Sequence, residues 1–411
     1  MSEKVNAMPL KPRQRPLKVA VLFSPLYANL RQKAAGVARY SRLYGPWEFS
    51  VVPRGLQDPF LPDVSQWRPD GVIGQNLTPA IIDRIVDAKI PIIVFEPTYE
   101  QRREEHPFHG SPTVRIDSEA IGQLAAQYFL ERHFSHFAYV CEYDNIYWSD
   151  VREEAFSRVL HDYGYPCDVY HGHNLHENMV DRDSDLERWL MQLPKPVAIL
   201  ACNDHQGRRV LNSCLRTDIS VPYQASVLGV DNDEFFCMTA NPMLSSIGTE
   251  AEWGGYQGAK MLDLLLRGET TAEKDILYGP TETVSRQSTA VTTLADPFVI
   301  KALEFIRINN GCQIRVSDVI HHVNVSQRTL ENHFQTLLGT SIMDQIKKVR
   351  NETILRLVRE TDTPVKEIAL QVGFETSIHL CSVFRKEFGM TISTYRRDLC
   401  EREGLFPLDK Q

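Results

Sequence analysis

Short runs of consecutive apolar residues alternate, between residues 17 and 232, with longer stretches in which apolar residues recur every three or four positions. The short runs are typical of strands buried on both faces, and the longer period is typical of amphipathic helices. Strands are predicted at residues 17–23, 47–53, 70–75, 90–97, 113–117, 137–142, 197–203 and 226–232. Helices are predicted over residues 34–42, 79–88, 119–132, 150–162 and 204–215. This alternation predicts an α/β region of parallel sheets that are covered by helices on both faces.

The length of the α/β region, residues 17–290, predicts two lobes, each a doubly wound parallel sheet, because a single sheet rarely takes up so many residues. The lobes are expected over residues 17–133 with 243–270 and over 134–242 with 271–290. The other segments are predicted to be an N-terminal arm (1–16), a linker (291–297), an all-α domain (298–400) and a tail (401–411).

Two helix–turn–helix patterns follow each other in the last hundred residues, at 316–339 and 364–389. In each, one apolar stripe at helical spacing predicts the buried side of the second helix. The stripes are Leu330, Phe334, Leu337 and Leu338 in the first unit and Leu380, Val383, Phe384 and Phe388 in the second. A connecting helix is predicted over residues 342–359. Two such units in one chain can enter successive major grooves on one face of B-DNA, about 34 Å apart.

The outward faces of the two second helices are the candidate DNA contacts. In the first unit they are Gln327, Arg328, Glu331, Asn332 and Gln335. These side chains suit base edges, since Arg pairs with guanine, Asn or Gln with adenine and Glu with cytosine. In the second unit they are Ser377, Ile378, His379, Cys381, Ser382 and Arg385. With fewer long hydrogen-bonding side chains, the second helix is expected to position phosphates more than to discriminate bases.

The net charge of −8 argues at first against a nucleic-acid partner, but the charge is unevenly distributed. Residues 296–411 carry 16 Lys and Arg against 15 Asp and Glu, so the acidity lies upstream of them. The eight cysteines form no CxxC pair, which is typical of reduced thiols in the cytoplasm. No apolar run approaches the roughly 20 residues that span a bilayer, and the N-terminus lacks an apolar signal core, so no membrane partner is expected.

Polar residues stand where several predicted strands end, and parallel sheets bind ligands beyond the carboxyl ends of their strands. The candidate ligand-binding residues are Glu96, Asp117, Trp148, Arg152, Asn203, Asp204 and Asp231. Carboxylates accept hydrogen bonds from hydroxyls, Arg donates them and an aromatic ring covers the apolar face of a sugar, so the set suits a neutral polyhydroxyl ligand. Any one of these residues taken alone is as readily a loop or helix cap.

The string IALQVGFET…FRKEFGMT…YRR makes residues 297–398 resemble the DNA-binding domain of AraC-type transcription regulators, with Ile392 at a position where that family usually has Pro. Residues 17–290 resemble the two-lobed, periplasmic-binding-protein-like sensor of LacI-type repressors, through ILACND (199–204), SVLGVDND (226–233) and GYQGAKMLDLLL (255–266). The resemblance implies that Asp117, Trp148, Arg152, Asp204 and Asp231 contact an effector sugar.

The two resemblances together imply a sugar-responsive transcription regulator that binds a pentose, xylose first, and activates a sugar-catabolism operon. They also imply double-stranded DNA as a partner, a homodimer formed through the sensor domains, and RNA polymerase as a further partner. Another sugar, or repression in place of activation, remains open, because Glu96 and residues 24–26 depart from the family pattern.

Other classes of function fit the sequence less well. A sugar-processing enzyme is the distant alternative, but no GxGxxG follows the first strand, and no GxSxG or P-loop is present. An extracytoplasmic sugar-binding protein would need a signal peptide and would not explain the helix–turn–helix units. The histidines at 171, 173, 176, 321 and 322 lack a complete zinc-ligand set, so neither a metal nor a cofactor is expected.

Overall fold

The computed structural model describes residues 15–23, 26–51, 68–142, 145–171, 179–269, 273–290 and 296–403. The chain divides into two compact units, residues 1–293 and 294–411. Most of the predicted arm, linker and tail lies outside the described residues, as do residues 24–25 and the histidines at 173 and 176.

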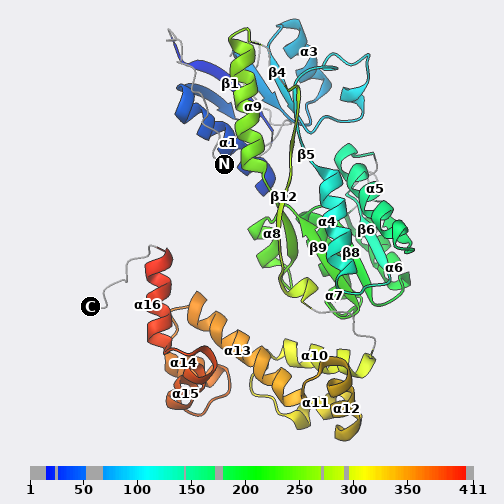
Figure 1. The fold of residues 1–411 in the computed structure, drawn as a ribbon, viewed down its shortest axis with the longest axis vertical. Helices are drawn as coiled ribbons and strands as arrows, with labels where there is room; N and C mark the ends of the chain where they lie inside the picture. Colours follow the sequence, from blue (N-terminus) through cyan, green and yellow to red (C-terminus); the bar gives the residue numbers. More distant parts are fainter. Residues whose placement is uncertain are drawn as a thin grey trace. The chain divides into compact units, whose positions relative to one another are not determined.

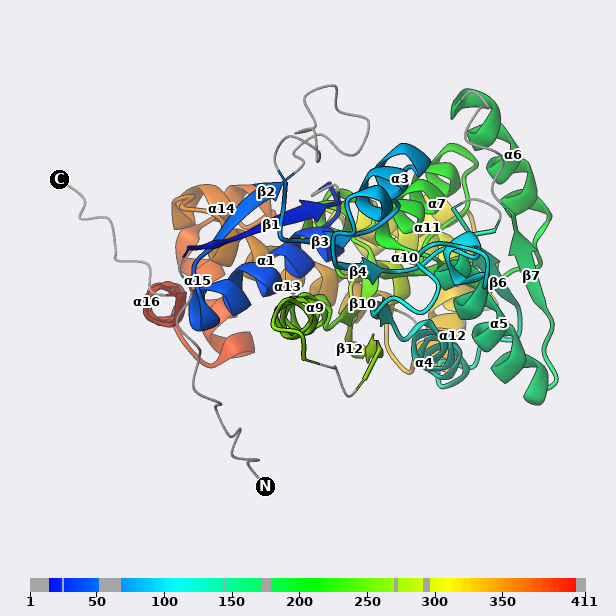
Figure 2. The ribbon, with the colours of Figure 1, turned by 90° about the horizontal axis from the view of Figure 1, so that it is seen from above.

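The first sheet of unit 1 has six parallel strands in the order β11-β5-β4-β3-β1-β2. Three of them, β1, β4 and β5, are labelled in Figure 1. Its strands are β1 (Leu17–Leu22), β2 (Trp47–Val51), β3 (Gly71–Gly74), β4 (Ile92–Phe95), β5 (Thr113–Ile116) and β11 (Asp275–Tyr278). Side chains alternate between its faces. Val19 and Val21 pack toward α1 (Ala28–Tyr44) and α9 (Ala251–Leu266), whereas Ala20 and Leu22 pack toward α3 (Pro79–Asp87) on the other face (Figure 2). A short 3-10 helix, η1 (Glu100–Arg102), follows β4.

The second sheet has the order β12-β10-β9-β8-β6-β7, in which only β12 is antiparallel to its neighbour among the described strands. Its strands are β6 (Phe137–Val140), β7 (Cys167–Tyr170), β8 (Val197–Ala201), β9 (Ala225–Val230), β10 (Ser245–Thr249) and β12 (Pro280–Val284). Helices α4 (Ser118–Leu130) and α5 (Tyr147–Asp162) cover one face, and α6 (Met179–Gln192) and α7 (Asp204–Arg216) the other. The short helices α8 (Glu234–Thr239) and η2 (Gln287–Thr289) complete this lobe.

The predicted boundaries between the lobes were wrong in three places. Strand β10 joins the second sheet and β11 the first, and α4 packs in the second lobe, where the Tyr128 hydroxyl bonds the hydroxyls of Ser285 (2.8 Å) and Thr289 (2.6 Å). The chain therefore crosses between lobes after β5, after β10 and after β11 (Figure 1). Periodicity predicts that a segment is a strand, but the sheet that the strand joins depends on contacts with residues far away in the sequence.

Helices α1 and α9 approach each other through glycines. A Cβ atom built on Gly255 would lie 2.0 Å from the carbonyl oxygen of Lys33, and one on Gly36 would lie 1.9 Å from that of Glu252. Both distances are far shorter than a van der Waals contact, so no side chain fits between the helices at these positions and the two backbones touch directly. This contact fixes where α1 lies, and with it the side chains that α1 directs at the cleft between the lobes.

Unit 2 is all α-helical, and the predicted fold class of the two parts is confirmed. Its helices are α10 (Pro297–Ile308), α11 (Val316–Val323), α12 (Gln327–Leu338), α13 (Ile342–Glu360), α14 (Val365–Gln371), α15 (Ser377–Phe388) and α16 (Ile392–Glu403). In the first predicted stripe Leu330 and Phe334 are buried, but Leu337 is 44% exposed, because the stripe drifts toward solvent at the end of α12. No helix of the described residues in either unit is long and apolar enough to cross a membrane.

Replacing Gly255 by Ala is expected to destabilise unit 1 by about 1–3 kcal/mol, because the added methyl has no room between α1 and α9. All five tryptophans lie in residues 1–293, so their fluorescence during urea unfolding follows unit 1. Leu215→Ala is the control: its side chain is 62% exposed, and we expect a change within about 0.5 kcal/mol. Equal unfolding midpoints for Gly255→Ala and wild type would contradict direct backbone contact.

Candidate functional site

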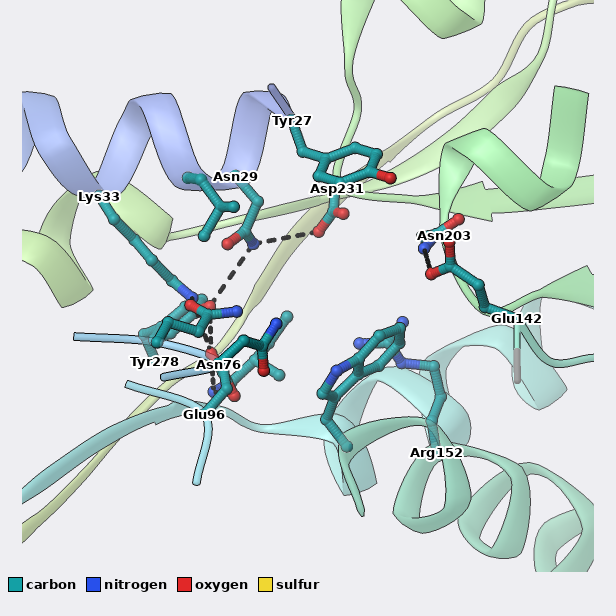
Figure 3. Close-up of a pocket in the computed structure, with 14 residues that line it drawn as sticks. Tyr27, Asn29, Lys33, Asn76, Glu96, Glu142, Arg152, Asn203, Asp231 and Tyr278 are labelled. Carbon is teal, nitrogen blue, oxygen red and sulfur yellow. Dashed lines mark hydrogen bonds and ion pairs between the residues drawn. The ribbon is translucent and has the colours of Figure 1, made fainter. Parts of the chain in front are cut away.

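A cavity of about 150 Å³ lies in the cleft between the lobes of unit 1, at the carboxyl ends of strands from both sheets (Figure 3). A cavity of about 150 Å³ can hold one small ring compound. Its walls come from α1, from α5 and from the segments that follow β3, β4, β6, β8 and β9. The lining residues are Tyr27, Asn29, Leu30, Lys33, Gln75, Asn76, Glu96, Ile116, Glu142, Trp148, Arg152, Asn203, Asp231 and Tyr278.

A buried ion pair closes the first-lobe side of this cavity. Lys33 Nζ lies 2.9 Å from Glu96 Oε1, and both side chains are almost fully buried. The Tyr278 hydroxyl donates to the same oxygen (2.8 Å), and the Ile116 N–H donates to both carboxylate oxygens of Glu96 (3.1 Å each). Burial, together with the negative charge of Glu96, raises the pKa of Tyr278 well above its usual value and keeps the phenol protonated. These contacts satisfy two charges that would be costly if left unpaired.

Asp231, at the end of β9, is one of the two carboxylates that the second lobe brings to the cavity, the other being that of Glu142. Asn29 Nδ2 on α1 donates to its Oδ1 (3.1 Å), so this bond joins the two lobes. Burial raises the pKa of Asp231 from 3.8 to about 6, although Arg152, Lys33 and the bond from Asn29 favour the ionised form. Asp231 therefore carries its charge at neutral pH in surroundings that water reaches poorly.

Arg152, on α5, is 2% exposed and has a donor without an acceptor. Its Nη1 donates to the carbonyl of Cys202 and its Nη2 lies 3.5 Å from Ser118 Oγ, while the guanidinium stands 5.0 Å from the centre of the Trp148 ring. Its Nε–H has no partner among the described residues. A buried, unsatisfied N–H costs roughly 1–3 kcal/mol. The nitrogen itself has almost no exposed surface, so a ligand oxygen can reach it only if the surrounding side chains move.

Asn203 and Glu142 form the remaining polar wall of the second lobe. Asn203 caps α7 by accepting from the Gln206 N–H (2.9 Å), and its Nδ2 donates to Glu142 Oε2 (3.1 Å). The Nδ1 atom of His205 lies 3.7 Å from the other oxygen of Glu142. Both groups reach the cavity from segments that follow parallel strands, which is where such sheets bind ligands.

The structure brings five of the seven predicted ligand residues to the cavity wall: Glu96, Trp148, Arg152, Asn203 and Asp231. Asp117 instead caps α4, accepting from the Ala120 N–H (2.9 Å), and lines a neighbouring cavity of about 280 Å³ that shares Glu96 and Trp148. Asp204 is buried behind the wall, where it accepts from the Asp233 N–H and from the Ser246 hydroxyl (2.6 Å each). Its carboxylate supports the loop that carries Asp231.

Several lining residues were not predicted from the sequence. Gln75, Asn76 and Glu142 follow β3 and β6, so the strand-end rule would have found them. Tyr27, Asn29 and Lys33 belong to the beginning of α1, and Tyr278 to the last strand of the first sheet. Their patterns are those of an ordinary amphipathic helix and a short strand, which carry no sign of a site.

The two predicted DNA-facing helices, α12 and α15, have the outward faces that their spacing suggests. In α12, Gln327, Arg328, Asn332 and Gln335 are exposed. Glu331 is half-buried, and its carboxylate accepts from the Ile342 N–H (3.3 Å), so part of its hydrogen-bonding capacity serves the start of α13.

In α15, Ser377 is half-buried and Ile378 is 81% exposed, and His379 rests edge-on against Phe374, with ring centres 5.0 Å apart. Cys381, Ser382 and Arg385 are exposed. The outward face of α15 therefore carries fewer long hydrogen-bonding side chains than that of α12.

Two family models match the chain: one described as a periplasmic binding protein-like domain, over residues 113–289, and one described as a helix-turn-helix domain, over residues 320–398. The xylose operon regulatory protein of Haemophilus influenzae is 30% identical over 386 residues, which cover 92% of this chain and 98% of that protein. That of Escherichia coli K12 is 29% identical over 387 residues and covers 92% and 96%. The structure of a xylose-binding transcription activator matches with a TM-score of 0.79 at 28% identity, and covers 93% of this chain and 98% of that one.

The raised pKa of Asp231 predicts a pH-dependent stability. Between about pH 4 and pH 6 the folded protein keeps a proton on this carboxyl that the unfolded chain has lost, so the free energy of unfolding falls as the pH rises through this range. Asp231→Asn removes the titrating group. We expect the variant to be more stable than wild type by about 3 kcal/mol at pH 7 and above, and the difference to vanish toward pH 4. Urea unfolding at several pH values measures this difference in the free energy of unfolding. A difference that stays the same at every pH would contradict a raised pKa for Asp231.

Proposed function

Since the chain belongs to the family of the xylose operon regulatory proteins, we propose that unit 1 binds a pentose, D-xylose first, and that unit 2 binds operator DNA. The chain is a transcription regulator with a sugar-sensor architecture and an AraC-type helix–turn–helix domain. On this proposal the protein, when it binds the sugar, activates transcription of a sugar-catabolism operon.

The unpartnered Nε–H of Arg152 is the observation that carries the sugar proposal. Once a small movement of the neighbouring side chains exposes it, it supplies one donor at a wall where Asp231, Glu142 and Asn203 offer acceptors, so a ligand with neighbouring hydroxyls can satisfy both sides at once. The Trp148 ring lines the same wall and offers an apolar surface to the C–H face of a sugar.

The charges around the cavity favour a neutral ligand. Lys33 is bound to Glu96, and the guanidinium of Arg152 favours the ionised form of Asp231, so neither cation is left to hold an anionic group. A sugar phosphate or a sugar acid would bring a further negative charge beside these carboxylates and would be repelled. A free monosaccharide satisfies the same donors and acceptors without that cost.

The lobes already touch across the cleft, and these contacts are a route by which a ligand can act. Asp233, next to the end of β9, accepts from the backbone N–H of Ala28 at the start of α1 (2.8 Å). With the bond between Asn29 and Asp231, this links the first turn of α1 to the second lobe. A ligand held by both lobes stabilises this closed arrangement relative to an open one and shifts the population toward it.

We assign the roles of the predicted residues accordingly. Glu96, Trp148, Arg152, Asn203 and Asp231 contact the sugar, whereas Asp117 and Asp204 support the helix and the loop behind them. The DNA contacts are the outward residues of α12 and α15. The partners are double-stranded DNA, a second copy of the chain through unit 1, and RNA polymerase at the promoter, and the compartment is the cytoplasm.

Asp231→Asn is expected to weaken D-xylose binding by about tenfold or more, because the loss of a hydrogen bond to a charged group costs roughly 1.5–3 kcal/mol. Isothermal titration calorimetry of the full chain with D-xylose, L-arabinose and D-ribose measures the affinity. Asp117→Asn is the matched control: Asn also caps helices, and the residue does not line the cavity, so the affinity should stay at the wild-type value.

Equal loss in the two aspartate variants would move the binding site toward Asp117 and the neighbouring cavity. Absence of heat with every pentose would overturn the proposed class of effector.

Arg328→Ala is expected to lower the affinity for the operator by about 1–3 kcal/mol if the guanidinium binds a guanine edge. Fluorescence anisotropy with the operator duplex and with a scrambled duplex of equal length measures this. Loss on the operator alone supports base recognition. An equal loss on both duplexes would show that Arg328 contacts only phosphate.

A further inference from the structure

Helices α12 and α15 are built on the same scaffold, fifty residues apart. Each has twelve residues. Their N-caps, Ser326 and Thr376, each accept a hydrogen bond from the backbone N–H three residues on (3.2 Å in both). Each helix ends at a glycine in the left-handed region, Gly339 (φ 64°) and Gly389 (φ 74°). Each residue of α12 therefore has a structural counterpart in α15.

The buried positions of the two helices agree, but the outward positions do not. Leu330 and Phe334 correspond to Leu380 and Phe384, and all four are fully buried. At the second position of each helix, however, Arg328 corresponds to Ile378. The Ile378 side chain is 81% exposed, on the first turn of its helix. The first turn of a recognition helix is the part that contacts base edges in the major groove.

The residues around Ile378 shape the surface that it presents. Cys381 and Ser382, three and four positions further on, are exposed and lie on the same side of α15. Their counterparts in α12 are Glu331 and Asn332, which are longer. The side chains beside Ile378 are therefore short, and the long donor of this face, Arg385, lies about two turns further along the helix.

We propose that Ile378 reads the 5-methyl group of a thymine, while Arg328, at the same position of α12, reads a guanine. The thymine methyl is the apolar group that base edges offer in the major groove, so it is the partner that an exposed isoleucine can recognise there. The two half-sites then differ in chemistry, and one chain binds its operator in a single orientation. The inference rests on the proposed DNA-binding function and names what its second helix recognises.

The test uses a duplex selected from random-sequence DNA by the full chain, with and without D-xylose. Each thymine of the selected site is replaced in turn by deoxyuridine, which removes the methyl group and keeps the base pair. We expect wild type to lose affinity about three- to tenfold at one or two positions of one half-site. The Ile378→Ala variant should bind the thymine duplex more weakly than wild type by a similar factor. Replacing thymine by deoxyuridine should then weaken its binding no further, because in a double-mutant cycle both changes remove the same contact.

Two control variants make the result specific. Ile308→Ala removes an isoleucine that is 69% exposed on α10 and should bind as wild type does. Arg328→Ala should bind more weakly but keep the wild-type response to deoxyuridine. The unfolding midpoint of Ile378→Ala should equal that of wild type, because the side chain lies outside the core.

The inference is overturned if Ile378→Ala binds the selected duplex as tightly as wild type, or if it keeps the full response to deoxyuridine. Normal DNA affinity with reduced transcription in vitro would assign Ile378 to a protein contact and would also overturn it. Failure of the chain to select any sequence is a different outcome: it would overturn the proposed DNA-binding function itself.

Discussion

A buried guanidinium with one unmet donor is the interaction on which the account of the sensor depends. Arg152 is held by the carbonyl of Cys202 and faces the Trp148 ring, so its position is set before any ligand arrives. Its Nε–H lacks an acceptor among the described residues. Burial raises the pKa of Asp231 nearby, which makes the ionised carboxylate less favourable there than in water. A polar ligand between them relieves both deficits, which makes binding of hydroxyl groups favourable in a site that offers no surplus charge.

The same site connects the ligand to the arrangement of the lobes. Asn29 and Lys33 lie on α1, whose backbone is pressed against α9 by glycines, whereas Arg152, Asn203 and Asp231 belong to the second lobe. A molecule that contacts both sets gains binding free energy only when the lobes are together. The helix–turn–helix unit has its own core and its own caps, so the sugar need not build the DNA-binding surface; it need only change how that surface is presented.

The sequence predicted the fold class, five of the six strands of the first sheet, three of the six strands of the second and the outward faces of α12 and α15, because each depends on local periodicity. Glu96, Asn203 and Asp231 were found because they follow buried strands, and parallel strands bring their ends together. The same rule misplaced Asp204, whose carboxylate turns toward the Ser246 hydroxyl, and it could not find Lys33 or Tyr278. Lys33 reaches the cavity because Gly255 lets α1 lie against α9, a contact between residues more than two hundred positions apart.

A structure of the full chain determined with D-xylose would show where the sugar binds and which groups hold it. We expect one sugar in the cavity between the lobes, with a ring or hydroxyl oxygen within hydrogen-bonding distance of Arg152 Nε and a hydroxyl donating to Asp231. A sugar bound elsewhere, for example in the neighbouring cavity beside Asp117, with the Arg152 Nε–H still without an acceptor, would contradict it.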